Sequence, residues 1–277
     1  MTTVLVIILW TSYTILPKQS VNPKHIGILC AMPEEIGSAL KNLRNIKETT
    51  FGDLKIFSGE WSNYEYGHDF FYVSVAWSGW GKVCAARAAT RLIGILYKQT
   101  KVNFLFFTGV AGAGNVNLKQ WDIVIPSELI QYDMDARPLF PKYVVPILNR
   151  AKIYVPEPLV KWATVTLSDS KPSNFGKVEN GLVATGDKFI ADKSKLEKIR
   201  IGLPEINAVE MEGAAVAQIA CQENIPFLII RVISDSADEC ASQNFSEFLK
   251  EYERQSWQLL ELLLKNFKNS PILNPSK

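Results

Sequence analysis

Residues 82–114 read KVCAARAATRLIGILYKQTKVNFLFFTGVAGAG, a helix-like segment followed by a strand-like one. Lys82–Lys98 is rich in alanine and spaces its apolar residues three and four apart, which predicts a long helix. Asn103–Thr108 is an almost unbroken apolar run, typical of a strand that is buried on both faces. The glycine-rich residues 109–114 predict a loop at the carboxyl end of that strand.

The same alternation of strands and helices extends in both directions from this segment. The expected strands are His25–Ala31, Leu54–Phe57, Phe70–Val75, Trp121–Pro126, Gly181–Thr185, Ala208–Met211 and Pro226–Ile233. The expected helices are Glu34–Arg44, residues 156–169, Lys193–Ile201, Gly213–Glu223 and Phe245–Lys265. This order predicts an α/β fold, a three-layer α/β/α domain with a central mixed, largely parallel sheet.

Composition indicates an ordinary globular protein, with 277 residues of which 47% are hydrophobic and 21% charged. No low-complexity linker or internal repeat divides the chain. We therefore expect one domain over residues 25–267, an apolar extension over residues 1–24 and a polar, frayed tail over residues 268–277. The net charge of +2 predicts no general affinity for nucleic acid or membranes.

The N-terminal extension contains the apolar run VLVIILW at residues 4–10. No basic residue precedes it, no clear cleavage site follows, and it is too short to span a membrane. Three interpretations remain: an imperfect signal peptide, an additional element packed on the domain, or a start codon assigned too far upstream. We expect a cytoplasmic protein, with export as the alternative.

Histidine and cysteine are poorly placed for metal binding or nucleophilic catalysis. The chain has two histidines, His25 and His68, and four scattered cysteines, at positions 30, 84, 221 and 240. Neither an ordinary zinc site nor a histidine-based triad can be assembled readily from them. No metal or organic cofactor is implied, so any catalysis must rely on carboxylates.

Acidic residues do occur where catalysis would need them, after three of the expected strands. They are, in chain order, Glu34, Glu35, Glu210, Glu212, Asp235 and Asp238. Ligands of parallel sheets bind at the carboxyl ends of the strands, so we expect these side chains to lie near one site. Each acid alone is also explained as a helix N-terminal charge or a turn residue.

Such a set of carboxyl groups fits the cleavage of a purine nucleoside. This reaction requires protonation of the leaving base, deprotonation of a water molecule and a hold on the ribose. Carboxyl groups in different environments can divide the acid and base roles. Carboxylates also accept hydrogen bonds from the ribose hydroxyls.

Six short runs of the chain resemble the bacterial 5′-methylthioadenosine/S-adenosylhomocysteine nucleosidases, of the nucleoside phosphorylase superfamily. They are IGILCAMPEE (26–35), SGWGKV (78–83), TGVAG (108–112), TGDKFI (185–190), AVEMEG (208–213) and RVISDSAD (231–238). The resemblance covers roughly residues 25–266. It implies a nucleoside phosphorylase-like fold, a homodimer and a small-molecule adenine nucleoside as partner. The implied reaction is hydrolysis of the N-glycosidic bond of methylthioadenosine, S-adenosylhomocysteine or 6-amino-6-deoxyfutalosine, which releases adenine.

The resemblance also assigns roles to matching residues. It implies that Glu35 is the general base for the attacking water and that Asp235 assists protonation of adenine N7. The implied substrate-binding residues are Glu212 at the ribose hydroxyls, Met211 against the sugar, Phe189 stacked on the base, Ile190 reading the adenine edge, Arg231 and Glu210 near the water and ribose, Met32 and Trp80 near the sugar and its 5′-substituent, and Ser234 beside Asp235. From sequence alone, core packing explains Phe189, Met211 and Met32 equally well.

Two alternative functions remain open. A purine nucleoside phosphorylase would need cationic or N–H donors around its phosphate, whereas the loop after the first strand presents Pro33-Glu34-Glu35. Phosphorylases of this superfamily carry an arginine-bearing loop there, so hydrolysis is favoured. A non-catalytic or exported nucleoside-binding protein on the same fold is the other alternative, because a fold does not determine a function.

Val110 and Arg137 depart from the family pattern. Val110 stands where the family commonly has a serine that helps to hold the nucleophilic water. Arg137 lies in a loop that, in the family, helps to close the pocket for the 5′-substituent, partly across the dimer interface. It is either a solvated arginine paired with Asp133 or Asp135, or the partner of a carboxylate on the substrate. The second hypothesis predicts that Arg137→Ala raises KM for carboxylated nucleosides and spares methylthioadenosine.

Overall fold

The computed structural model describes residues 24–63, 69–238 and 241–273. The strands are β1 (His25–Cys30), β2 (Arg44–Phe51), β3 (Leu54–Asn63), β4 (Asp69–Trp77), β5 (Leu96–Tyr97), β6 (Thr100–Lys101), β7 (Phe104–Ala113), β8 (Ile123–Gln131), β9 (Lys152–Tyr154), β10 (Val178–Thr185), β11 (Ile206–Glu210) and β12 (Phe227–Asp235). The helices are α1 (Lys82–Ile93), α2 (Glu157–Ser170), α3 (Lys193–Gly202), α4 (Gly213–Gln222), α5 (Ala241–Tyr252) and α6 (Ser256–Asn266).

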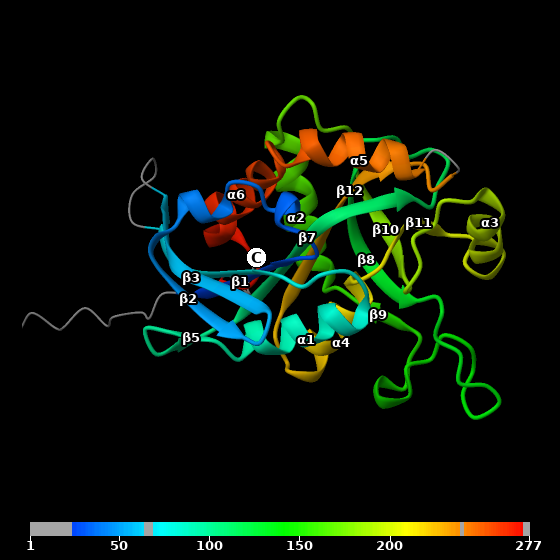
Figure 1. Ribbon diagram of the computed structural model, residues 1–277, viewed down its shortest axis with the longest axis horizontal. Coiled ribbons are helices and arrows are strands. Elements are labelled where there is room, and N and C mark those ends of the chain that lie inside the picture. The colour runs from blue at the N-terminus through cyan, green and yellow to red at the C-terminus, as the bar shows by residue number, and fades with distance from the viewer. Residues whose placement is uncertain (1–23, 64–68, 239–240, 274–277) are drawn as a thin grey trace, which may run out of the picture.

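One sheet of ten strands forms the middle layer, in the order β11-β10-β8-β12-β7-β1-β4-β3-β2, with β9 beside β8. Helices α2, α5 and α6 cover one face, and α1 and α4 cover the other (Figure 1). The sheet is parallel from β12 through β7 and β1 to β4, and again from β8 through β10 to β11. Antiparallel pairings join β2 to β3, β3 to β4 and β8 to β12. The predicted three-layer α/β/α fold with a mixed, largely parallel sheet is confirmed.

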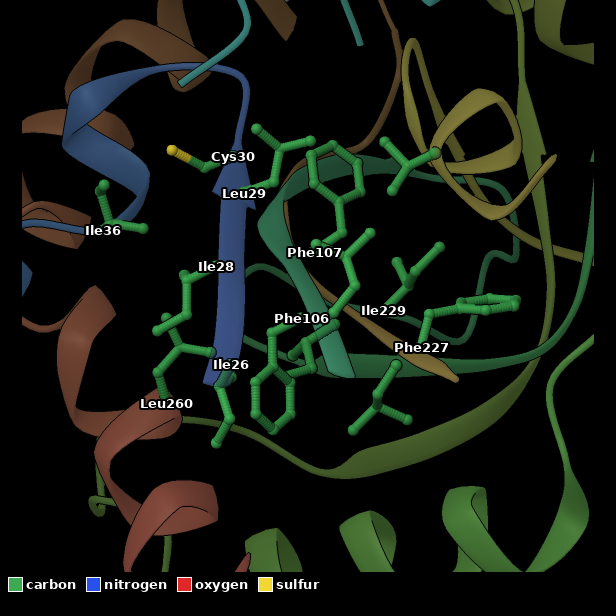
Figure 2. Packing of buried hydrophobic residues seen from close by; sticks show 14 of the residues in the cluster. Ile26, Ile28, Leu29, Cys30, Ile36, Phe106, Phe107, Phe227, Ile229 and Leu260 are labelled. Atoms are coloured by element: carbon green, nitrogen blue, oxygen red, sulfur yellow. The ribbon is translucent and has the colours of Figure 1, made fainter. Parts of the chain in front are cut away.

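The core is densest where β1, β7 and β12 run side by side. In the register of these strands, Ile28 of β1 pairs with Phe106 of β7, and Phe107 of β7 pairs with Ile229 of β12. All four side chains, labelled in Figure 2, are fully buried. Burial of each such side chain stabilises the fold by about 1.5–3 kcal/mol. Burial therefore anchors β1 and β12, whose carboxyl ends carry Glu35 and Asp235, and the strand β7 between β1 and β12.

The predicted helix over Glu34–Arg44 is wrong. Two short 3₁₀ turns, Pro33–Glu35 and Ala39–Asn42, occupy this segment, and β2 begins at Arg44. Gly37 between the turns has a positive φ of 45°, a conformation that interrupts a helix and suits glycine. A Cβ atom at Gly37 would collide with the carbonyl oxygen of Glu253, so the turn is fixed by its contact with the chain between α5 and α6.

Three further boundaries differ from the sequence-based expectation. Helix α1 ends at Ile93, and the residues up to Lys101 form the small β5–β6 hairpin. The expected glycine-rich loop at 109–114 is largely the end of β7, which pairs there with β11 and β12. The expected single helix over Phe245–Lys265 is two helices, α5 and α6.

The C-terminal residues up to 273 pack on the domain, in contrast to the expected fraying. Ser270 is fully buried, and Ile272 and Leu273 contact the main core. The apolar run at residues 4–10 lies outside the described residues. Across the described ranges, no helix combines the length and the hydropathy needed to cross a bilayer.

Candidate active site

A pocket with about 550 Å³ of empty space, part of it open to solvent, lies at the carboxyl ends of β1, β7, β11 and β12. The pairing of β11 with the end of β7, and of β12 with β7, brings these strand ends together. Ten of the predicted site residues line the pocket: Met32, Glu35, Trp80, Phe189, Ile190, Glu210, Met211, Glu212, Ser234 and Asp235. Arg231 does not form its wall but is bonded to wall residues, and Arg137 is not brought to it.

Glu35 is held on the floor of the pocket by three backbone N–H groups. Its Oε2 accepts from Ala31 N at 2.7 Å and from Met32 N at 2.9 Å, and its Oε1 accepts from Val110 N at 2.9 Å. The 3₁₀ turn after β1 folds the side chain back over the strand end. Burial raises the pKa of Glu35, although Arg231 and these N–H groups oppose the shift. A fixed carboxylate with a raised pKa is suited to accept a proton near neutral pH.

Arg231, on β12, is a buried cation with free donor capacity beside Glu35. Its Nη2 donates to Glu210 Oε2 at 2.5 Å, and its guanidinium lies 4.1 Å from the centre of the Phe107 ring. Its Nε and Nη1 have no hydrogen-bond partner within the described part of the chain. A Cβ atom at Gly109 would collide with both Arg231 Nη1 and Glu35 Oε1. A hydrogen-bond donor and an acceptor therefore converge over the bare backbone of this glycine.

Glu210 and Glu212 form the second carboxylate cluster, at the end of β11. Glu210 accepts hydrogen bonds from Glu212 N at 3.1 Å, from Gly213 N at 2.7 Å and from the hydroxyl of Thr185. Glu212 accepts from Gly81 N at 2.7 Å, a contact that ties it to the loop after β4. Burial, and then the neighbouring Glu210, raise the pKa of Glu212.

Asp235 ends β12 on another part of the wall. Ser234 Oγ donates to its Oδ2 at 2.7 Å, and Ala237 N donates to its Oδ1 at 2.8 Å. Burial raises the pKa of Asp235, against the opposing effect of both hydrogen bonds. The carboxyl group therefore retains its proton to higher pH than an exposed aspartate does, as a general acid requires.

Aromatic side chains form the rim. Trp80 is 51% exposed and Phe189 is 38% exposed. Phe245 of α5 lies between them, edge-to-face with Trp80 at 6.1 Å and with Phe189 at 5.6 Å between ring centroids. The sequence-based reasoning missed Phe245 and Lys188 as lining residues. The sequence offered only weak signals for these two residues. Phe245 is the first residue of an expected amphipathic helix, and Lys188 is the neighbour of Phe189.

Arg137 is paired locally. Its Nε donates to Asp135 Oδ1 at 2.8 Å, and its Nη2 donates to Asp135 Oδ2 at 2.5 Å. The Arg137 side chain is 60% exposed. This geometry matches the solvated, paired arginine that the sequence left open as one of two alternatives.

Taken together, the pocket joins a basic carboxylate, a buried cation with free donors, a carboxyl group poised to donate a proton and an aromatic rim. Such a set can perform acid–base cleavage of a bond between a sugar and an aromatic base. Within residues 24–63, 69–238 and 241–273, no group of three His, Cys, Asp or Glu side chains is arranged to hold a metal ion.

Comparison with known proteins shows the family of the chain. Residues 25–265 match the phosphorylase superfamily. The chain is 34% identical over 242 residues to 5′-methylthioadenosine/S-adenosylhomocysteine nucleosidase of Haemophilus ducreyi. This alignment covers 87% of this chain and 98% of the relative. The nucleosidase of Neisseria meningitidis in complex with methylthio-immucillin-A superposes with a TM-score of 0.77 at 32% identity, over 88% of this chain and 99% of that chain. Futalosine hydrolase of Helicobacter pylori gives a TM-score of 0.75 at 29% identity, over 88% and 98%. The chain belongs to the 5′-methylthioadenosine/S-adenosylhomocysteine nucleosidase family of the phosphorylase superfamily.

Proposed function

We propose that the protein hydrolyses the N-glycosidic bond of 5′-substituted adenine nucleosides and releases adenine. The observation that carries this proposal is that Glu35, Glu212 and Asp235 line one pocket, with Arg231 buried beside Glu35. The buried Arg231 stabilises the charge of the Glu35 carboxylate. A water molecule in the pocket passes its proton to this carboxylate. The water oxygen attacks C1′ of the ribose as the bond from C1′ to the purine breaks.

The leaving base takes its proton from Asp235. Expulsion of a purine anion is unfavourable, so a protonated carboxyl group near N7 lowers the barrier, and the raised pKa of Asp235 supports this role. Ser234 orients the carboxyl group through its hydrogen bond. Glu212 accepts hydrogen bonds from the ribose hydroxyls, while Phe189 stacks on the base, Ile190 reads its edge, and Met211 and Met32 pack against the sugar.

Charge favours water over phosphate as the nucleophile. A phosphate dianion beside Arg231 would also face Glu35 and Glu210, and the one guanidinium there is already bonded to Glu210. Val110 supplies only its backbone N–H, which Glu35 already occupies. Val110 offers no side-chain hydroxyl to the water, so we assign the hold on the water to Glu35.

The candidate substrates are methylthioadenosine, S-adenosylhomocysteine and 6-amino-6-deoxyfutalosine, which differ in their 5′-substituents. We further propose that the enzyme is a cytoplasmic homodimer. Large apolar side chains support the dimer because they are exposed at the start of α1 and in the segment after β8: Val83 is 81%, Leu139 84% and Ile147 72% exposed.

The test is adenine release from each of the three nucleosides in phosphate-free buffer, followed by chromatography. We expect turnover of at least one nucleoside, free ribose derivatives as co-products, and no rate change when phosphate is added. Phosphate-dependent turnover with a sugar 1-phosphate as product would identify a phosphorylase. Binding of the nucleosides without adenine release would identify a binding protein.

A further inference from the structure

Lys188 is the only cationic side chain among the described residues that line the pocket. The four acids of the lining, Glu35, Glu210, Glu212 and Asp235, are all buried on its floor. Lys188 is exposed at the mouth, next to Phe189. The pocket therefore changes from acidic at its floor to basic at its rim.

The loop that carries Lys188 is tied to the ribose side of the pocket. Asp187 Oδ1 accepts a hydrogen bond from Lys82 N at 2.8 Å. One residue earlier, Gly81 N donates to Glu212, the proposed ribose-binding carboxylate, at 2.7 Å. The loop of Lys188 therefore borders the part of the pocket that Trp80 and Glu212 line, which the proposed function gives to the ribose and its 5′-substituent.

Two acids of this loop cluster, Asp133 and Asp187, are already engaged. Lys82 Nζ lies 2.6 Å from Asp133 Oδ1 and 3.8 Å from Asp187 Oδ2. Asp133 Oδ2 also accepts from Asp187 N at 3.0 Å. Lys188 itself has no ion pair or side-chain hydrogen bond with any residue in the described part of the chain. Its ammonium group is therefore available to a ligand.

We propose that Lys188 pairs with a carboxylate at the end of the 5′-substituent and so makes the enzyme selective for anionic 5′-substituents. This inference rests on the proposed function and names the substrate class of the same pocket. A neutral 5′-methylthio group meets only the aromatic rim and gains nothing from the ammonium group. Because Lys188 is exposed and screened by solvent, the pairing affects substrate affinity more than the chemical step.

The experiment compares three variants on matched substrates. Lys188→Met keeps the unbranched apolar stem and removes the charge, Lys188→Arg keeps the charge, and Lys198→Met makes the same charge change on exposed α3, outside the pocket. The substrates are S-adenosylhomocysteine, the same nucleoside with its carboxylate converted to an amide, and methylthioadenosine. We expect Lys188→Met to raise KM for the carboxylate about five- to ten-fold, with kcat unchanged. KM for the amide and for methylthioadenosine should stay within about two-fold of wild type, as should all values for the other two variants.

An equal rise in KM for all three substrates, or no rise for the carboxylate, overturns the inference. Absence of adenine release by the wild type defeats the proposed function instead. In that case, calorimetric titration of wild type and Lys188→Met with the carboxylate and the amide tests whether Lys188 binds the carboxylate. A loss of affinity confined to the carboxylate supports the pairing, and equal affinities overturn it.

Discussion

Glu35 on the floor of the pocket and Arg231 beneath it are 3% and 1% exposed, whereas Trp80 on the rim is 51% exposed. The floor residues come from strand ends or the turn after β1, and backbone N–H groups or a buried ion pair hold them. The rim residues come from loops and the start of α5, and they touch mainly one another. In the proposed mechanism, the sheet positions the residues of the chemical step and the loops select the 5′-substituent. Substitutions on the floor should therefore change kcat, and substitutions on the rim should change KM.

The largest effect is expected for Glu35→Gln. The amide cannot accept the proton of the attacking water, so kcat should fall by about 10²- to 10⁴-fold. KM should change little, because the proposed mechanism places Glu35 at the water and not at the nucleoside. Steady-state kinetics with methylthioadenosine and a thermal unfolding curve check the result. A variant that unfolds near the wild-type temperature yet keeps full kcat would remove Glu35 from the mechanism.

The pH profile separates the two carboxyl groups on the floor. Burial raises the pKa of both Glu35 and Asp235. The base must be deprotonated, so activity falls as pH drops through the raised pKa of Glu35. The acid must be protonated, so activity falls as pH rises through the raised pKa of Asp235. In Asp235→Asn the residual activity should lack the alkaline limb and keep the acid limb; persistence of the alkaline limb would assign it to another group.

An intermediate effect is expected for Gly109→Ala. The added methyl group would collide with Arg231 Nη1 and Glu35 Oε1, so these groups must move apart. We expect a loss of kcat of about 10- to 100-fold and a destabilisation of about 1–3 kcal/mol. Gly94→Ala is the matched control, because a Cβ there meets only Thr90 O at 3.5 Å and Arg91 O at 3.7 Å. Equal kcat values for both variants would show that the convergence over Gly109 is not needed.

The sequence predicted the floor far better than the rim, and the reason is physical. The strands His25–Ala31 and Pro226–Ile233 are covered on both faces, so continuous apolar runs mark them and show where their carboxyl ends lie. The acids that follow could then be assigned to one sheet edge. Strand β2 (Arg44–Phe51) was missed because it is largely exposed, pairs only with β3 and carries no apolar pattern.

The rim depends on how distant segments fold over the pocket, which spacing along the chain does not reveal. Phe245 reaches Trp80 and Phe189 only because α5 crosses the end of β12. Lys188 is available to a ligand because the acids of its loop cluster, Asp133 and Asp187, are paired with Lys82. The roles of individual residues came from the family resemblance. Six short motifs in the right order are enough to identify a family, but they do not show how the residues are arranged in space.

The smallest effect is expected for Arg137→Ala. The Arg137–Asp135 pair is exposed and joins residues two apart, and such pairs contribute about 0–1 kcal/mol. KM for S-adenosylhomocysteine and methylthioadenosine should therefore stay within about two-fold of wild type, while Lys188→Met discriminates between them. A selective rise in KM for the carboxylated nucleoside in Arg137→Ala would contradict this expectation. It would also show that the loop after β8 serves a pocket in a second subunit, and measurement of the same variant below and above the dimer dissociation concentration would then locate the contact.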